Sequence, residues 1–218
     1  MINKLNRAFI FDLDGVITET SEYHYMAWKT VCKKIGYDLT RKKNEELKGV
    51  NRKKCLDMIM EWGNIRLSEK EIESLLETKN NIYKDFIKDL NENDVCEGVL
   101  NFINDAIKNN IKIALYSASR NAKRILCQLK IIDLFTVIID GNNVSNAKPD
   151  PEGFKIAADL TKTNAKDCVV FEDSISGIEG ANKLNMYTVG IGSRDVLKNA
   201  DVVYKGFKNL KIKDIINV

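Results

Sequence analysis

The sequence lacks the features of a membrane, secreted or nucleic-acid-binding protein. Its 34 basic residues are nearly balanced by 31 acidic ones, and a net charge of +3 is too small to indicate nucleic acid or an anionic membrane as a partner. No apolar run approaches the roughly 20 residues that a membrane-spanning helix needs. The first apolar run, residues 8–11, is too short for a signal peptide. We therefore expect a cytoplasmic protein that binds neither membrane nor nucleic acid.

The cysteines are few and follow no pattern. Cys32, Cys55, Cys96, Cys127 and Cys168 lie far apart, and none forms a CxxC pair. An odd, scattered set argues against a disulfide framework or a zinc site and suits a reducing compartment. The chain also has only two prolines and no internal repeat, low-complexity tract or linker. Its 218 residues therefore fit one domain, or a core domain with a smaller insertion.

Short apolar runs alternate with helical segments over much of the chain. This alternation predicts a doubly wound, mostly parallel sheet with helices on both faces, an α/β fold. The expected strands are residues 8–11, 111–116, 137–139, 168–171, 187–191 and 202–204, and the expected helices are residues 100–107, 122–129, 152–160 and 175–184.

The segment after the first strand has a different pattern. From about residue 23 to 89 the apolar positions recur at intervals of three and four, which predicts about four helices joined by short polar links. The first strand belongs to a sheet whose other members come only after residue 95, so this helical segment is an insertion. We expect residues 1–18 and 94–218 to form an α/β core and residues 19–93 a helical cap domain.

Carboxylates follow two of the predicted strands, at the sheet edge where open α/β folds bind ligands. Asp12 and Asp14 share one side of the chain, and two crowded carboxylates favour a divalent cation or a shared proton. Glu172 and Asp173 follow a later strand in the same way, and hard oxygen ligands suit magnesium. The alternatives are an acidic surface turn for the first pair and, for the second, a helix cap formed by Asp173 or Ser174.

Two further strand ends carry groups suited to phosphate. Ser117 ends a strand and Ser119 opens the next helix, where hydroxyls and free N–H groups can bind an anion. Lys148 precedes Pro149 in a loop before a helix and offers a point charge to a phosphoryl group. The ordinary alternatives are that the serines only cap a helix and that Lys148 is one more exposed lysine.

In this chain order, the DxDG, Ser-Ala-Ser, Lys-Pro and Glu-Asp strand ends resemble the haloacid dehalogenase superfamily. The resemblance implies that Asp12 attacks phosphorus and becomes an aspartyl phosphate, while Asp14 acts as general acid and base. It also implies that Mg²⁺ is held by Asp12, the backbone carbonyl of Asp14, Glu172 and Asp173. Ser117 and Lys148 would steady the transferring phosphoryl oxygens.

The helical segment resembles one branch of that superfamily, the β-phosphoglucomutase family. The motifs are Glu22-Tyr23-His24, Ala27-Trp28, Leu47–Arg52 and Ser117–Asn121. The resemblance implies that Arg52 in the cap and Ser119, Arg120 and Asn121 in the core grip a second, non-transferring phosphate, for which a guanidinium fork is well suited. The remaining residues that it implies at the substrate are His24, Trp28, Gly49, Val50, Asn51, Lys79 and Ala118.

Some of these positions have ordinary alternatives or depart from the family pattern. Trp28 is also explained as a core aromatic residue, and His24 as a polar helix residue. Glu19 stands where the family has aspartate, Cys55 where it has serine, and Arg120 where it has lysine. In relatives the bond before the proline corresponding to Pro149 is cis.

The resemblance implies a magnesium-dependent intramolecular phosphotransferase of the isomerase class. We expect it to interconvert β-D-glucose 1-phosphate and glucose 6-phosphate through the aspartyl phosphate and a β-glucose 1,6-bisphosphate that acts as a catalytic cofactor. We also expect small-molecule sugar phosphates as its partners and a monomeric protein. The first alternative is a sugar-phosphate phosphatase with the same nucleophile, and the second is a non-catalytic sugar-phosphate sensor.

Overall fold

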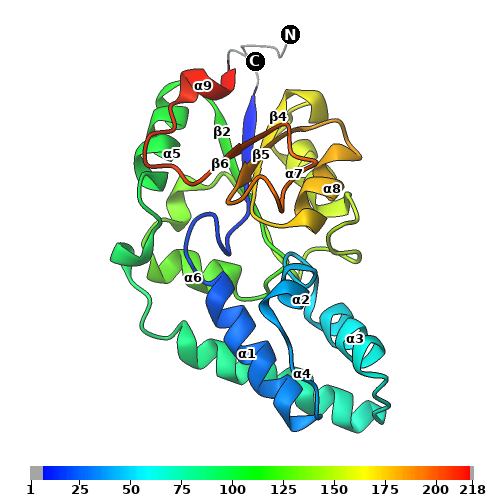
Figure 1. The fold of residues 1–218 in the computed structure, drawn as a ribbon. Helices are drawn as coiled ribbons and strands as arrows, with labels where there is room; N and C mark the ends of the chain where they lie inside the picture. The colour runs from blue at the N-terminus through cyan, green and yellow to red at the C-terminus, as the bar shows by residue number, and fades with distance from the viewer. Residues whose placement is uncertain (1–6, 217–218) are drawn as a thin grey trace.

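The computed structural model describes residues 7–216 of the chain, which form an α/β layer structure with a helical layer beside it (Figure 1). The sheet has the strand order β3-β2-β1-β4-β5-β6, and all its neighbouring strands are parallel. Its strands are β1 (Ala8–Phe11), β2 (Lys112–Tyr116), β3 (Val137–Ile139), β4 (Cys168–Glu172), β5 (Tyr187–Ile191) and β6 (Val202–Tyr204). The predicted doubly wound α/β fold is confirmed.

The central strand β1 is buried on both faces, and its alternate residues pack against different helices. Phe9 and Phe11 face one cluster with Phe102 of α5 (Val99–Lys108), whereas Ile10 faces the other with Phe154 of α7 (Glu152–Leu160). This two-sided burial explains why β1 reads as an unbroken apolar run. The remaining core helices are α6 (Ala122–Gln128), α8 (Ile175–Asn182) and α9 (Ile212–Ile216).

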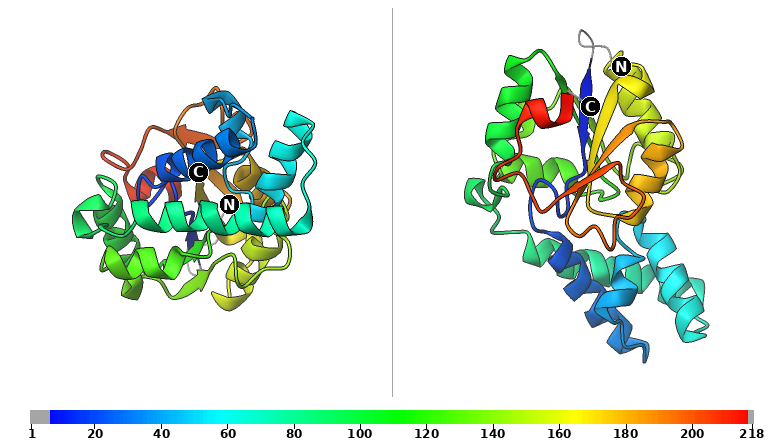
Figure 2. Two further views of the ribbon diagram at one scale, coloured as in Figure 1. Left: turned by 90° about the horizontal axis from the view of Figure 1, so that it is seen from below. Right: turned by 45° about the horizontal axis from the view of Figure 1, so that its top comes forward.

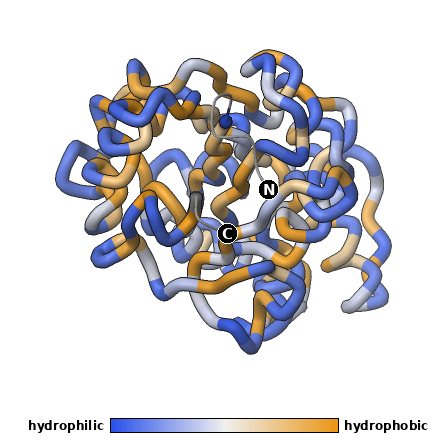
Figure 3. The backbone as a smooth tube through the Cα atoms, turned by 90° about the horizontal axis from the view of Figure 1, so that it is seen from above, coloured by the Kyte–Doolittle hydropathy of each residue, from blue (hydrophilic) through white to orange (hydrophobic). Residues whose placement is uncertain are grey.

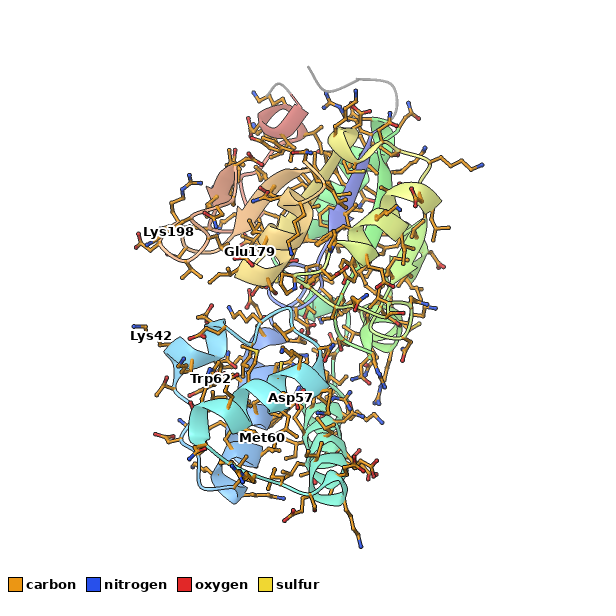
Figure 4. The ribbon with its side chains drawn as sticks, turned by 90° about the vertical axis from the view of Figure 1, so that its right-hand side faces the viewer. Lys42, Asp57, Met60, Trp62, Glu179 and Lys198 are labelled. Atoms are coloured by element: carbon orange, nitrogen blue, oxygen red, sulfur yellow. The ribbon has the colours of Figure 1, made fainter. Side chains whose placement is uncertain are left out.

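Four helices lie together beyond the carboxyl ends of the strands, and we call them the cap helices (Figures 1 and 2). They are α1 (Ser21–Lys34), α2 (Arg41–Glu45), α3 (Arg52–Gly63) and α4 (Glu69–Phe86). Their own apolar cluster includes Trp28, Val31 and Leu56. Figure 4 shows Asp57 and Met60 on α3 and, apart from them, Glu179 on α8 of the core. Hydrophilic and hydrophobic stretches alternate along the peripheral helices, as amphipathic helices require (Figure 3).

Local signals fix where the cap helices α3 and α4 begin. Asn51 caps α3 by accepting a hydrogen bond from the backbone N–H of Lys54 at 2.8 Å, which places Arg52 in the first turn. Ser68 and Glu71 form a capping box at the start of α4. Each start therefore follows from side chains that are close in sequence.

Two chain segments connect the cap helices with the core, and they run side by side. Thr18 forms an antiparallel bridge with Val95, and the backbone N–H of Cys96 donates to the carbonyl of Ile17 at 2.9 Å. The entry into the cap and the return from it are thus paired at one place. In the described part of the chain, no helix is both long and apolar enough to cross a membrane.

Most expected elements match the structure within one or two residues. The strand expected at 168–171 continues to Glu172, and the helix expected at 175–184 ends at Asn182. Helix α9 and the short 3₁₀ segments at 92–94, 132–134 and 165–167 were not expected, since elements of three to five residues have no measurable period.

Candidate active site

A cavity of about 420 Å³ lies between the carboxyl ends of the strands and the cap helices. Asp12 and Asp173 line it from the core, while His24, Arg52 and Lys79 line it from the cap. The cavity therefore joins a carboxylate-rich wall to a wall rich in basic groups.

Lys148 is buried beneath this cavity and has a carboxylate on two sides. Its ammonium donates to Asp12 Oδ1 at 2.5 Å, to Glu172 Oε2 at 2.8 Å and to the carbonyl of Tyr116 at 3.1 Å. These contacts use all the hydrogens that an ammonium can donate. Burial alone lowers the pKa of Lys148, but the two carboxylates outweigh burial and hold it above its ordinary value. The Lys148–Pro149 bond is cis.

Three carboxylates surround one point beside Lys148. One ligand oxygen from each of Asp12, Glu172 and Asp173 lies within 4.8 Å of the others. Burial raises the pKa of Asp173 to about 7, although Lys48 opposes the shift, and burial also raises the pKa of Asp12. Clustered carboxylates are costly to ionise unless more positive charge is nearby, and their hard oxygen donors suit Mg²⁺. Of the two residues expected as alternatives for the helix cap, Ser174 caps α8, and its hydroxyl accepts from the N–H of Gly177.

Asp14 is held by three side chains from the cap segment, all directed at Oδ1. The Thr20 hydroxyl donates at 2.5 Å, the Tyr83 hydroxyl donates at 3.0 Å, and His24 Nε2 lies 3.4 Å away. Burial alone raises the pKa of Asp14, but these contacts, His24 foremost, hold it below its ordinary value. In this arrangement Asp14 is a carboxylate that is ready to accept a proton.

His24 and Lys79 form a close pair. Lys79 Nζ lies 2.6 Å from His24 Nδ1 and over the rings of Trp28 and Tyr83, at 5.4 and 4.8 Å from their centroids. Burial lowers the pKa of Lys79 to about 7, and burial together with Lys79 lowers the pKa of His24. Trp28 belongs to the apolar cluster of the cap and also lines the cavity, so both of its expected environments occur at once.

Two guanidinium groups also line the cavity. Arg52 comes from α3 and Arg120 from the core loop before α6, and both line the cavity. Within residues 7–216 neither one has a carboxylate within ion-pair distance. Burial, and then the charge of Arg120, lower the pKa of Arg52. Two basic groups that form no ion pair within the described residues suit an anionic ligand.

The cap touches the core closely at Gly49. This residue has φ = +71°, and a Cβ there would lie 2.5 Å from the hydroxyl oxygens of Ser174 and Ser176. The Ser176 hydroxyl also donates to the carbonyl of Lys48 at 2.8 Å. Glycine is therefore required both by its backbone conformation and by the closeness of the helix start.

The structure brings the expected residues together around one cavity. Three of them, Ser117, Lys148 and Glu172, lie buried beneath its floor. Those that line the cavity are Asp12, Asp14, His24, Trp28, Gly49, Val50, Asn51, Arg52, Lys79, Ala118, Ser119, Arg120, Asn121 and Asp173. Their roles in the reaction stay predictions.

The departures from the family pattern lie in different surroundings. Glu19 is exposed, and Cys96 points its thiol toward it at 3.7 Å. Cys55 is buried at the cavity wall, where its thiol lies 3.5 Å from the carbonyl of Leu47 and 3.4 Å from that of Val50. The thiol thus occupies a position where a hydroxyl would donate to the same carbonyls.

Sequence reasoning missed several side chains of the site. Thr20, Tyr83, Lys48 and Asn80 contact residues that were expected there. Tyr83 stands four residues after Lys79 on the same helix, so the i, i+4 spacing could have placed it on the cavity face. Lys48 lies inside the quoted Leu47–Arg52 motif, and no comparable signal marks Thr20 or Asn80.

The fold and the site together define the class, a phosphotransferase with a carboxylate cluster and a buried lysine at the strand ends of an α/β core. Residues 9–191 match the haloacid dehalogenase-like hydrolase family, and the chain belongs to this family.

Two relatives and one solved structure match most of the chain. The chain is 37% identical over 209 residues to a β-phosphoglucomutase of Bacillus subtilis, which covers 95% of this chain and 92% of the relative. It is 30% identical to a phosphorylated carbohydrates phosphatase of Thermotoga maritima, over 80% of this chain and 79% of that one. The crystal structure of a β-phosphoglucomutase from Clostridium difficile superimposes with a TM-score of 0.92 at 42% identity, covering 98% and 96% of the two chains. The expected family relationship is confirmed.

Proposed function

We propose that this protein is a magnesium-dependent mutase that interconverts β-D-glucose 1-phosphate and glucose 6-phosphate. The observation that carries the proposal is that one cavity holds two sets of groups: its first end, as we assign it, has the nucleophile and the carboxylate cluster, and the second has Arg52 and Arg120. A phosphatase for a monophosphate needs only the first end, whereas a sugar bisphosphate needs both.

The reaction begins with Asp12 carrying the phosphoryl group. Asp14 accepts the proton of the sugar C6 hydroxyl as that oxygen attacks phosphorus, and the bond between phosphorus and the Asp12 oxygen breaks. The product is the bisphosphate. After it turns over, Asp12 attacks the phosphorus at C1, and Asp14 returns the proton to the departing C1 oxygen. Glucose 6-phosphate leaves, and Asp12 is again phosphorylated.

Positioning and charge compensation by the surrounding groups make both transfers possible. Lys148, which already donates to Asp12, and the Ser117 hydroxyl orient the transferring phosphoryl oxygens. When bound by Asp12, the Asp14 carbonyl, Glu172 and Asp173, Mg²⁺ would offset the negative charge that gathers there. Thr20, Tyr83 and His24 hold Asp14 in place for its two proton transfers.

The opposite end of the cavity holds the phosphate that is not being transferred. Arg52, Ser119, Arg120 and Asn121 bind it, and His24, Trp28, Lys79 and the stretch from Gly49 to Asn51 surround the sugar. The same end receives the C6 phosphate in one half of the reaction and the C1 phosphate in the other. The β-glucose 1,6-bisphosphate accordingly serves as the catalytic cofactor.

Exclusion of water decides between mutase and phosphatase. We assign residues 1–18 and 94–218 to the core and residues 19–93 to a cap that opens at the paired segments around Thr18 and Val95. Closure brings Lys48 and Gly49 against the start of α8 and covers Asp12. Because one chain supplies every group that lines the cavity, we propose that a monomer is the active form.

A sugar-phosphate phosphatase is the second candidate, favoured by the likeness to the Thermotoga maritima enzyme. The test is to incubate the protein with Mg²⁺, β-glucose 1-phosphate and a trace of the bisphosphate, and to measure glucose 6-phosphate and free phosphate together. The mutase gives glucose 6-phosphate in large excess, whereas free phosphate alone would contradict it. Asp12→Asn should be inactive in both assays while its circular dichroism spectrum stays that of the wild type.

A further inference from the structure

Asn80 on α4 joins the cap to the core through one side-chain oxygen. Its Oδ1 accepts a hydrogen bond from Arg52 Nη2 at 2.8 Å and another from Asn121 Nδ2 at 3.3 Å. Arg52 belongs to the cap and Asn121 to the core loop before α6. The carbonyl of Leu76, one turn earlier on α4, lies 3.5 Å from Arg52 Nη1. A single amide oxygen thus fixes two groups that we assign to the phosphate that is not being transferred, which we call the distal phosphate.

The neutrality of Asn80 matters as much as its position. Arg52 and Arg120 face the cavity, and in the part of the chain that the structure describes no carboxylate pairs with either of them. A carboxylate at position 80 would orient Arg52 equally well, but it would also neutralise the guanidinium and compete with an arriving anion. An amide orients the guanidinium and leaves its charge available.

We propose that Asn80 is a positioning residue for the distal phosphate, which aims Arg52 and Asn121 at one point and so links phosphate binding to closure of the cap. This inference rests on the proposed mutase function. The hydrogen bonds of Asn80 run to Arg52 and Asn121 and not to Asp12 or Asp14, so it acts on ligands that carry a second phosphate and leaves the transfer chemistry itself unchanged.

The chain offers a matched control for the test. Asn81 is the next residue of α4, has the same side chain and is exposed. We expect Asn80→Ala to lose about tenfold or more in kcat/KM for the mutase reaction, mainly through KM, because a hydrogen bond to a charged group is lost. Its hydrolysis of a small monophosphate, acetyl phosphate, should stay within about twofold of the wild type. Asn81→Ala should match the wild type in both assays.

Two further variants separate positioning from a general structural effect. Asn80→Asp should raise KM, since its carboxylate pairs with Arg52, while the melting temperature is retained; it keeps the test decisive if Asn80→Ala folds poorly. In an Arg52→Ala background, Asn80→Ala should cost less than it does in the wild type, because its contact with Arg52 is already gone and only that with Asn121 is left to lose.

The outcomes distinguish the inference from the function on which it rests. Equal losses of mutase and hydrolase activity in Asn80→Ala, or losses that add fully to those of Arg52→Ala, would overturn the role of Asn80. A wild type that isomerises the sugar phosphate alongside an equally active Asn80→Ala would overturn the inference alone. A wild type that forms only free phosphate would overturn the mutase function and the inference with it.

Discussion

The ammonium nitrogen of Lys79 lies 2.6 Å from Nδ1 of His24, and Nε2 of the same ring lies 3.4 Å from the carboxylate of Asp14. A buried cation, an imidazole and the proposed general acid–base are therefore aligned across the cap wall of the cavity. When Lys79 is protonated, its ammonium can only donate, so Nδ1 of His24 accepts and the proton of the neutral ring is on Nε2, which faces Asp14. Because burial lowers the pKa of Lys79 to about 7, the number of protons on this group of side chains changes with pH near neutrality.

Lys79 should make the stability of the protein depend on pH. Burial holds its pKa at about 7 in the folded protein, against an ordinary value of 10.5. Between these values the unfolded chain binds more protons, so the folded state gains stability as pH rises from 7 to 10.5. We expect the free energy of unfolding of the wild type, relative to Lys79→Met, to rise over this range by on the order of a few kcal/mol.

Chemical denaturation of both proteins at several pH values measures this difference. Lys84→Met, on the same helix but half-buried, serves as the control for the loss of a lysine from α4. A flat difference for Lys79→Met would mean that Lys79 keeps its ordinary pKa in the folded protein.

Tyr83 should tune the pKa of Asp14. Its hydroxyl donates to the Asp14 carboxylate at 3.0 Å and so favours the ionised form. Tyr83→Phe should raise the pKa of Asp14 and move the acid limb of the kcat/KM profile to higher pH by roughly half a unit to one unit. Tyr204→Phe, on β6, is the control for a lost hydroxyl. A Tyr83→Phe profile that coincides with the wild type would remove this role.

Arg52 should matter only where a second phosphate is present. Arg52→Ala removes one of the two guanidinium groups that line the cavity and that we assign to the second phosphate. We expect kcat/KM of the mutase reaction to fall about a hundredfold, and hydrolysis of acetyl phosphate to change little. Lys54→Ala, an exposed neighbour on α3, is the control. Parallel losses in both reactions would contradict a distal-phosphate site at Arg52.

Magnesium should stabilise the folded protein through the carboxylate cluster. A chelator should abolish activity, and Mg²⁺ at a hundred times its dissociation constant should add about 2.7 kcal/mol to the free energy of unfolding. Asp173→Ala should lose this stabilisation, because it removes one of the three clustered carboxylates. Asp85→Ala, exposed on α4, should keep it. An Asp173→Ala protein that Mg²⁺ still stabilises fully would place the metal elsewhere.

The sequence predicts the core wall of the site well because strand geometry is local. Asp12 and Asp14 stand two residues apart at a strand end, and Glu172 and Asp173 end another strand of a parallel sheet, so their meeting at one edge follows from topology alone. The sequence places Lys148 at the same edge of the sheet. It does not predict which groups Lys148 contacts, because its three acceptors come from separate strands.

The cap wall is less predictable, because its contacts depend on how the cap lies on the core. The bond from Asn121 to Asn80 joins residues 41 positions apart, and that from Ser176 to the Lys48 carbonyl spans 128 positions. Helical periodicity places Lys79 on an inner face, yet it does not say which core loop that face meets. The family resemblance supplied Arg52 and Lys79, whereas Asn80 emerged only from the structure.

The central claim is that the phosphoryl group of Asp12 passes to a sugar hydroxyl and not to water. The most direct test is turnover of β-glucose 1-phosphate with Mg²⁺ and a trace of bisphosphate in ¹⁸O-labelled water, followed by mass spectrometry of all phosphate-containing products. The account predicts abundant unlabelled glucose 6-phosphate and little labelled free phosphate. Labelled free phosphate as the main product would show that water reaches the aspartyl phosphate, and would contradict the mutase.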